Sequence, residues 1–156
     1  FYLMIKKISL LILTLIILNN CGYTPIYSKK NYNFEIKKIE MLGETTINKL
    51  LSNKLKVYKD NPEAKNSISL IINSQSFKTT ITKDKKGNPT QFSMSINVDV
   101  KVIDDSNNQT ETTFSENSTY DNSDNKFDLR KYEDNLVKNM SEKIFSELTL
   151  FIQTKN

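Results

Sequence analysis

Residues 90–104, "TQFSMSINVDVKVID", alternate between apolar and polar side chains along their whole length. Successive side chains of a strand point to opposite faces, so this pattern predicts a strand with one apolar and one polar face. The apolar set is Phe92, Met94, Ile96, Val98, Val100 and Val102, and the polar set includes Ser93, Ser95, Asn97, Asp99 and Lys101. Such a strand needs neighbouring strands and a second layer over its apolar face.

Three other segments are predicted as strands, namely residues 33–42, 66–84 and 109–122. In the first of them the apolar alternation changes phase at Lys37–Lys38, which predicts a β-bulge. The third is polar and is predicted to be an edge strand. Turns are expected at residues 85–89 and 104–108.

Two segments are predicted as helices by apolar residues spaced three and four apart. The first begins at Thr45 or Thr46 as N-cap, ends before Pro62, and carries the stripe Ile47, Leu50, Leu51, Leu55 and Tyr58. The second covers residues 125–154, with Asp124 or Asn125 as cap. Its stripe, which we assign to the core rather than to a lipid groove, is Leu129, Tyr132, Leu136, Met140, Ile144, Leu148 and Phe151/Ile152.

The predicted order is therefore β-α-β-β-β-α. Each helix has one apolar stripe and the clearest strand has one apolar face. These elements predict an α+β fold, a two-layer sandwich with both helices on one face of a four-stranded, mostly antiparallel sheet.

The composition argues against an enzyme. The 156-residue chain contains no His, no Trp and a single Cys, so it cannot form a Ser-His-Asp triad or a Cys/His zinc site. Its three glycines are isolated, which excludes the glycine-rich loops that cradle phosphates. We expect neither a metal nor a cofactor, and we expect one small domain.

The N-terminal segment has the pattern of a secretory signal. Lys6 and Lys7 precede an uncharged apolar run over residues 8–18, which is shorter than the roughly 20 residues of a membrane-spanning helix. With Leu18 at position −3 and Cys21 at +1, the segment resembles the lipobox of bacterial lipoproteins, although Asn20 replaces the usual small residue. The alternatives are an uncleaved anchor or an ordinary secretory signal.

This resemblance predicts three segments: a signal peptide at 1–20, a lipidated tether at 21–32 and one α/β domain at 33–156. It implies covalent lipid on Cys21, in place of any other cofactor. Stable anchoring takes two or more acyl chains, which a tri-acylated Cys21 would supply. Since Gly22 is not the Asp that signals inner-membrane retention in such lipoproteins, we expect a lipid-anchored, periplasm-facing protein of the cell outer membrane.

The stretch "CGYTPIYS" resembles the opening of the lipopolysaccharide-assembly lipoprotein family (LptE), which begins Cys-Gly-aromatic-x-Pro-Leu-Tyr. The hairpin of residues 82–104 and the segment "STYDNS", which leads into a long amphipathic helix, are also similar to that family. The resemblance covers residues 21–152. It implies a non-enzymatic plug of the translocon β-barrel (LptD), in a 1:1 complex, that assists barrel assembly and binds lipopolysaccharide.

Charge is segregated along the chain. Residues 29–86 carry a net charge of +7 and residues 87–125 one of −6. Within the basic part, Lys83, Lys85 and Lys86 fall at one predicted hairpin tip. Lysine is a suitable point-charge partner for phosphate, so these residues are candidate ligands of the lipopolysaccharide phosphates. The alternative is a solvated turn that protects a sheet edge.

Two choices stay open. Ser93, Ser95, Asn97 and Thr112 are predicted on a polar sheet face, which would face either a barrel lumen or solvent. The alternative function is that of another small outer-membrane lipoprotein, either an accessory subunit of outer-membrane protein insertion or a peptidoglycan-synthase activator. Nucleic-acid binding is not favoured, because the basic excess is small and lacks interleaved aromatic residues.

Overall fold

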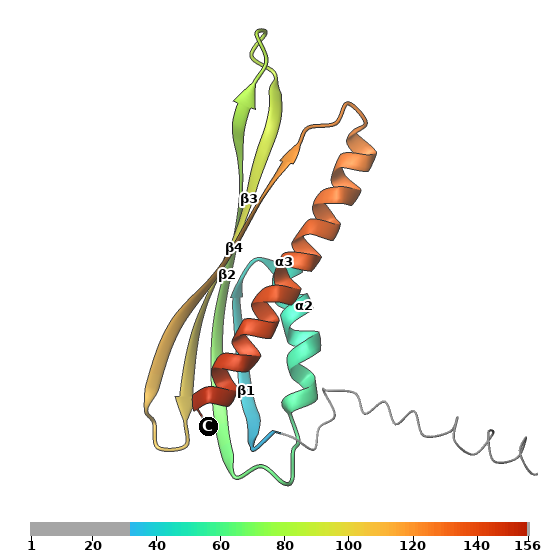
Figure 1. Ribbon diagram of the computed structural model, residues 1–156. Coiled ribbons are helices and arrows are strands. Elements are labelled where there is room, and N and C mark those ends of the chain that lie inside the picture. Colours follow the sequence, from blue (N-terminus) through green and yellow to red (C-terminus); the bar gives the residue numbers. More distant parts are fainter. Residues whose placement is uncertain (1–31, 156) are drawn as a thin grey trace, which may run out of the picture. The chain divides into compact units, whose positions relative to one another are not determined.

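The computed structural model describes residues 32–155, and the predictions for the signal peptide and for Cys21 lie outside them. Its element order is β1 (Phe34–Gly43), α2 (Thr45–Leu55), a 3₁₀ turn (Lys56–Tyr58), β2 (Asn66–Lys83), β3 (Pro89–Asp104), β4 (Gln109–Asp121) and α3 (Lys126–Lys155). This is the predicted β-α-β-β-β-α order, with both helices on one face of the sheet (Figure 1).

The four strands lie in the order β1-β2-β3-β4, so neighbours in sequence are neighbours in the sheet. β2, β3 and β4 pair antiparallel, whereas β1 and β2 pair parallel because α2 returns the chain to the starting edge. The β1 register shifts between Ile36 and Lys38, which confirms the predicted bulge.

The core lies between the helices and the apolar face of the sheet. Ile68, Leu70, Ile72, Ile96 and Val98 supply the centre of the sheet and are fully buried. The buried helix residues are Ile47, Leu51 and Leu55 of α2 and Leu129, Met140, Ile144, Phe145, Leu148 and Ile152 of α3. The strand predicted from the alternation in residues 90–104 is therefore confirmed, and it is one of the two inner strands of the sheet.

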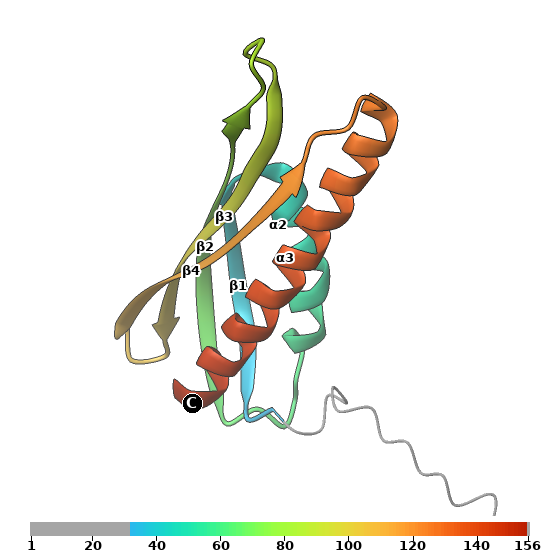
Figure 2. The same cartoon turned by 45° about the horizontal axis from the view of Figure 1, so that its top comes forward.

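The α3 stripe is buried only in part. Tyr132 was expected in the core, but it is 51% exposed. The first turns of α3 extend past the end of α2, beside the upper part of the β2–β3 hairpin (Figures 1 and 2). The sheet-facing position between Leu129 and Leu136 is taken by Glu133, whose side chain is only 18% exposed, and Tyr132 lies beside it.

The two helix caps differ in how well the sequence predicted them. Glu44 caps α2, with its carboxylate accepting a hydrogen bond from the Thr46 backbone N–H at 3.2 Å, so the predictions of Thr45 and Thr46 are wrong. Asn125 caps α3 as one of the two predicted residues. Its side-chain oxygen accepts from the backbone N–H groups of Phe127 (3.1 Å) and Asp128 (3.3 Å).

Candidate functional site: the basic hairpin tip

The turn between β2 and β3 is built around one aspartate. The Asp84 carboxylate accepts hydrogen bonds from the backbone N–H groups of Lys86 (2.8 Å) and Asn88 (2.9 Å) and from the Asn88 side chain (3.0 Å). Hydrogen bonds from the side chain and backbone of Asn88 are the main reason that the pKa of Asp84 lies below its usual value. Gly87 provides the positive φ of 87° that closes the turn.

This turn presents the predicted lysines together. Lys83 is the last residue of β2, while Lys85 and Lys86 lie in the turn, and all three are exposed. None of them forms an ion pair with another residue of the 32–155 region. We call these three residues the basic tip. The structure confirms their common location, and their role in binding phosphate stays a prediction.

Below the tip, the hairpin is braced against α3 by a cluster that the sequence did not predict. Lys78 of β2 lies 2.5 Å from Oε1 of Glu133, and the Tyr120 hydroxyl donates to the same oxygen at 2.7 Å. Partial burial would raise the pKa of Glu133, but the hydrogen bonds from Lys78 and Tyr120 outweigh that effect and lower it. Glu133 is therefore a fixed negative charge between the hairpin and the helix.

Aromatic rings complete this brace. The Lys78 ammonium lies over the Phe92 ring at 4.1 Å from its centroid, and the Phe92 and Tyr120 rings are 5.7 Å apart. Tyr132 of α3 extends the group, with its ring centroid 5.6 Å from that of Tyr120. The sequence signal for this cluster was a lysine, Lys78, on the inward face of β2. Its partner could not be predicted because Glu133 lies 55 residues further along the chain.

A polar hollow of about 450 Å³ adjoins the basic tip. It lies between the β2–β3 turn and the start of α3, and it is lined by Asp84, Asn88, Pro89, Thr90, Asn122, Asp124 and Lys126. The described residues contain no group of three or more carboxylates, histidines or cysteines that could hold a metal ion. Their helices include none that is long and apolar enough to span a membrane.

The opposite face of β3 is polar at Ser93, Ser95 and Asn97, as predicted, but one predicted residue lies elsewhere. Ser93 and Ser95 both accept hydrogen bonds from Asn117 Nδ2, at 3.0 and 2.6 Å. Thr112 pairs with buried Val100 and therefore lies on the helix-covered face, so its predicted place beside Ser93 and Ser95 is wrong.

Comparison with known proteins is informative at the level of structure. No protein-family model and no curated protein matches the sequence. The rare lipoprotein B of Shewanella oneidensis superposes with a TM-score of 0.52 at 10% identity, covering 76% of this chain and 99% of that one. An uncharacterised lipoprotein B of Nitrosomonas europaea gives 0.57 at 12% identity, covering 85% and 90%.

The fold is that of the rare lipoprotein B and LptE type. At this identity the likeness concerns the arrangement of the elements and not the side chains. The structure of this chain confirms the predicted α+β architecture.

Proposed function

We propose that this chain is an outer-membrane lipoprotein of the lipopolysaccharide translocon. In this role it binds the translocon β-barrel 1:1 as a plug, assists its assembly, and binds lipopolysaccharide during delivery to the cell surface. Its role is one of binding, not of catalysis. The observation that carries the proposal is a rare lipoprotein B fold in a chain whose Cys21 stands in a lipobox-like segment.

In this proposal the basic tip binds the lipopolysaccharide phosphates. Three ammonium groups are held within four residues of sequence by a turn that hydrogen bonds keep closed. The carboxylate among them, Asp84, is engaged by the turn itself. Clustered, exposed cations attract phosphate groups by charge, and this attraction weakens as salt rises.

Two measurements test the proposal. The first is an affinity purification of the C-terminally tagged chain from detergent-solubilised outer membranes, with mass spectrometry of partners and of the Cys21 peptide. We expect acylated Cys21 and a large β-barrel protein in equal yield. Acylated protein with a different barrel or a peptidoglycan synthase would contradict the translocon role, and unacylated Cys21 would contradict the lipoprotein assignment.

The second measurement is lipopolysaccharide binding by charge-reversal variants. Replacing Lys83, Lys85 and Lys86 with Glu should weaken binding by about tenfold or more at low salt, corresponding to about 1.4 kcal/mol. The matched control reverses three exposed lysines elsewhere, Lys49, Lys65 and Lys138, with the same change in net charge. Equal losses in both triple variants would show that only net charge matters and would remove the tip from the site.

A further inference from the structure

The upper part of β2 has an open edge. β1 pairs with β2 only as far as Gly43 opposite Ser74, and β2 continues to Lys83. Beyond Ser74, no other strand of the 32–155 region pairs with β2 on this side, since β3 lies on the other. Figures 1 and 2 both show the upper β2–β3 hairpin rising clear of β1.

The chain leaves this edge at a fixed point. Gly43 adopts a φ of 89°, and its α-carbon lies so close to β2 that an added Cβ would be 2.0 Å from the Ser74 carbonyl oxygen. The next residue, Glu44, donates its backbone N–H to that oxygen at 2.9 Å and begins the cap of α2. β1 therefore cannot extend along the rest of β2.

The direction of the Ser74 carbonyl shows which backbone groups face outward. It points to the β1 side of β2, and backbone polar groups alternate between the two edges of a strand. The N–H and C=O groups of Ser76, Lys78 and Thr80 therefore point to the open edge. Pairing with β3 is regular up to Thr80, where a bulge interrupts it, so residues 75–80 form a regularly paired strand with one open edge.

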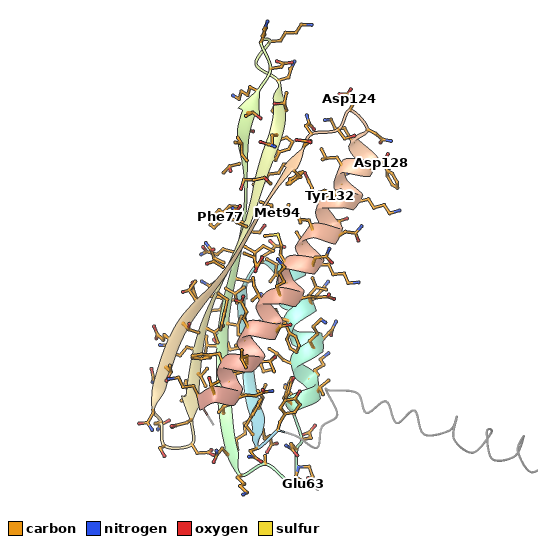
Figure 3. The ribbon with its side chains drawn as sticks, viewed as in Figure 1. Glu63, Phe77, Met94, Asp124, Asp128 and Tyr132 are labelled. Carbon is orange, nitrogen blue, oxygen red and sulfur yellow. The ribbon has the colours of Figure 1, made fainter. Side chains whose placement is uncertain are left out.

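This edge is only lightly protected against strand pairing. Proteins blunt exposed edges with proline, bulges or charged side chains, including charged side chains that point inward. Residues 75–80 contain no proline and no bulge, and their one charged residue, Lys78, is turned inward to Glu133. Phe77 is 50% exposed and projects from the hairpin away from α3 (Figure 3).

The geometry points to strand addition, and we propose that an extended segment of a partner protein pairs with residues 75–80 of β2. Backbone hydrogen bonds to the outward groups would hold it, and an apolar side chain of the segment would cover Phe77. The ends of the edge differ in charge, with Lys83 and the rest of the basic tip at one and Glu44 at the other. The segment therefore carries an acidic residue at the tip end and a basic residue at the Glu44 end. This inference goes beyond the proposed function and does not depend on it.

The probe is a pair of synthetic ten-residue peptides of alternating Thr and Val, with two Glu at one end and Lys at the other. One carries Glu at its amino end and one at its carboxyl end, so that both strand directions are tested. Binding to the full chain in detergent micelles is measured by fluorescence anisotropy. We expect one peptide to bind at micromolar concentrations. The same peptide N-methylated at alternate residues lacks the backbone N–H groups that would pair with β2, and we expect it not to bind.

The protein variants are matched at one position. Ser76→Pro removes an outward N–H and leaves the β3 pairing in place, so it should weaken peptide binding by about tenfold or more. Ser76→Ala keeps the N–H and should bind as the wild type does. Phe77→Lys, which guards the edge with a free charge, provides a second test should the proline variant fail to fold.

Three outcomes would overturn the proposal. The first is that the wild type binds neither peptide. The second is that Ser76→Pro and Phe77→Lys both bind a peptide as tightly as the wild type does. The third is a dimer of the chain itself, seen by light scattering and lost in Ser76→Pro. That result would assign the edge to a second copy of this chain.

Discussion

The Tyr120 hydroxyl donates a 2.7 Å hydrogen bond to Glu133, and this bond joins the last strand to the first half of α3. Burial and the neighbouring Glu133 carboxylate both raise the pKa of Tyr120, so the hydroxyl stays a donor at neutral pH. Lys78 reaches the same carboxylate from β2. One carboxylate thus ties the hairpin with the basic tip to both β4 and α3.

We predict that Tyr120→Phe lowers the free energy of unfolding by about 1–2 kcal/mol, because it removes one hydrogen bond to a charged group and preserves the ring. Tyr132→Phe is the control, since its ring is half exposed; its effect should stay within about 0.5 kcal/mol. Urea denaturation measures both. Equal effects of the two substitutions would show that the Glu133 bond contributes nothing.

Asp105 makes stability depend on acidic pH. Its carboxylate accepts hydrogen bonds from the hydroxyl and the backbone N–H of Ser67 and lies 3.0 Å from Lys37 in the β1 bulge. The Ser67 hydroxyl and backbone N–H, followed by Lys37, lower the pKa of Asp105 from 3.8 to about 2. Because the folded pKa is the lower one, the stabilisation is complete above pH 4 and is lost as the pH falls through about 2.

The test compares Asp105→Asn with the wild type over this pH range. The variant should be less stable at pH 7, and the difference should vanish below about pH 2. Asp124→Asn, an exposed substitution before α3, is the control for the change in net charge. A constant deficit of Asp105→Asn from pH 7 to pH 2 would contradict the assignment.

Two glycines with nearly the same φ should tolerate alanine differently. Gly43 and Gly87 have φ values of 89° and 87°, so alanine is strained by about 1 kcal/mol or more at either position. Only at Gly43 would the new methyl group meet backbone, the Ser74 carbonyl oxygen. Gly43→Ala should therefore lower the unfolding free energy by about 3 kcal/mol or more, well beyond Gly87→Ala. Similar values would show that β1 can shift to relieve the contact.

A second matched pair checks which face of the sheet is covered. Ile96 is fully buried beneath the helices, and its replacement by alanine should lower the unfolding free energy by about 2–5 kcal/mol. Phe77 is half exposed on the opposite face, so Phe77→Ala should lower the unfolding free energy of the unbound protein by no more than about 0.5 kcal/mol. A large loss for Phe77→Ala would mean that this face is packed even without a partner.

Local patterns carried most of the fold prediction. The bulge at Lys37–Lys38 and the alternation at residues 90–104 could be predicted because backbone direction fixes each side chain's face. The two hairpin turns share one pattern as well. Asp104 accepts from Ser106 and Asn108 just as Asp84 does from Lys86 and Asn88.

Contacts between distant segments could not be predicted in this way. The basic tip was found because its three lysines are close in sequence, whereas Lys78 and Glu133 meet only after α3 packs across the sheet. Glu44 was missed as a cap because the two threonines that follow it have the higher intrinsic preference for that role. Tyr132 was placed in the core because its spacing from Leu129 fits a helical stripe, whereas the charged Glu133 occupies the sheet-facing position next to it.

The strand order has a consequence for how the protein folds. Each strand pairs with the one that precedes or follows it in sequence, and β2, β3 and β4 are joined by tight turns, so pairing among these three strands closes only short loops. The sheet can therefore assemble early, from local contacts. Its apolar face then lacks the cover of α3, which follows all four strands in the chain, until that helix packs onto it. Aggregation during folding should depend on how fast the 30 residues of α3 dock.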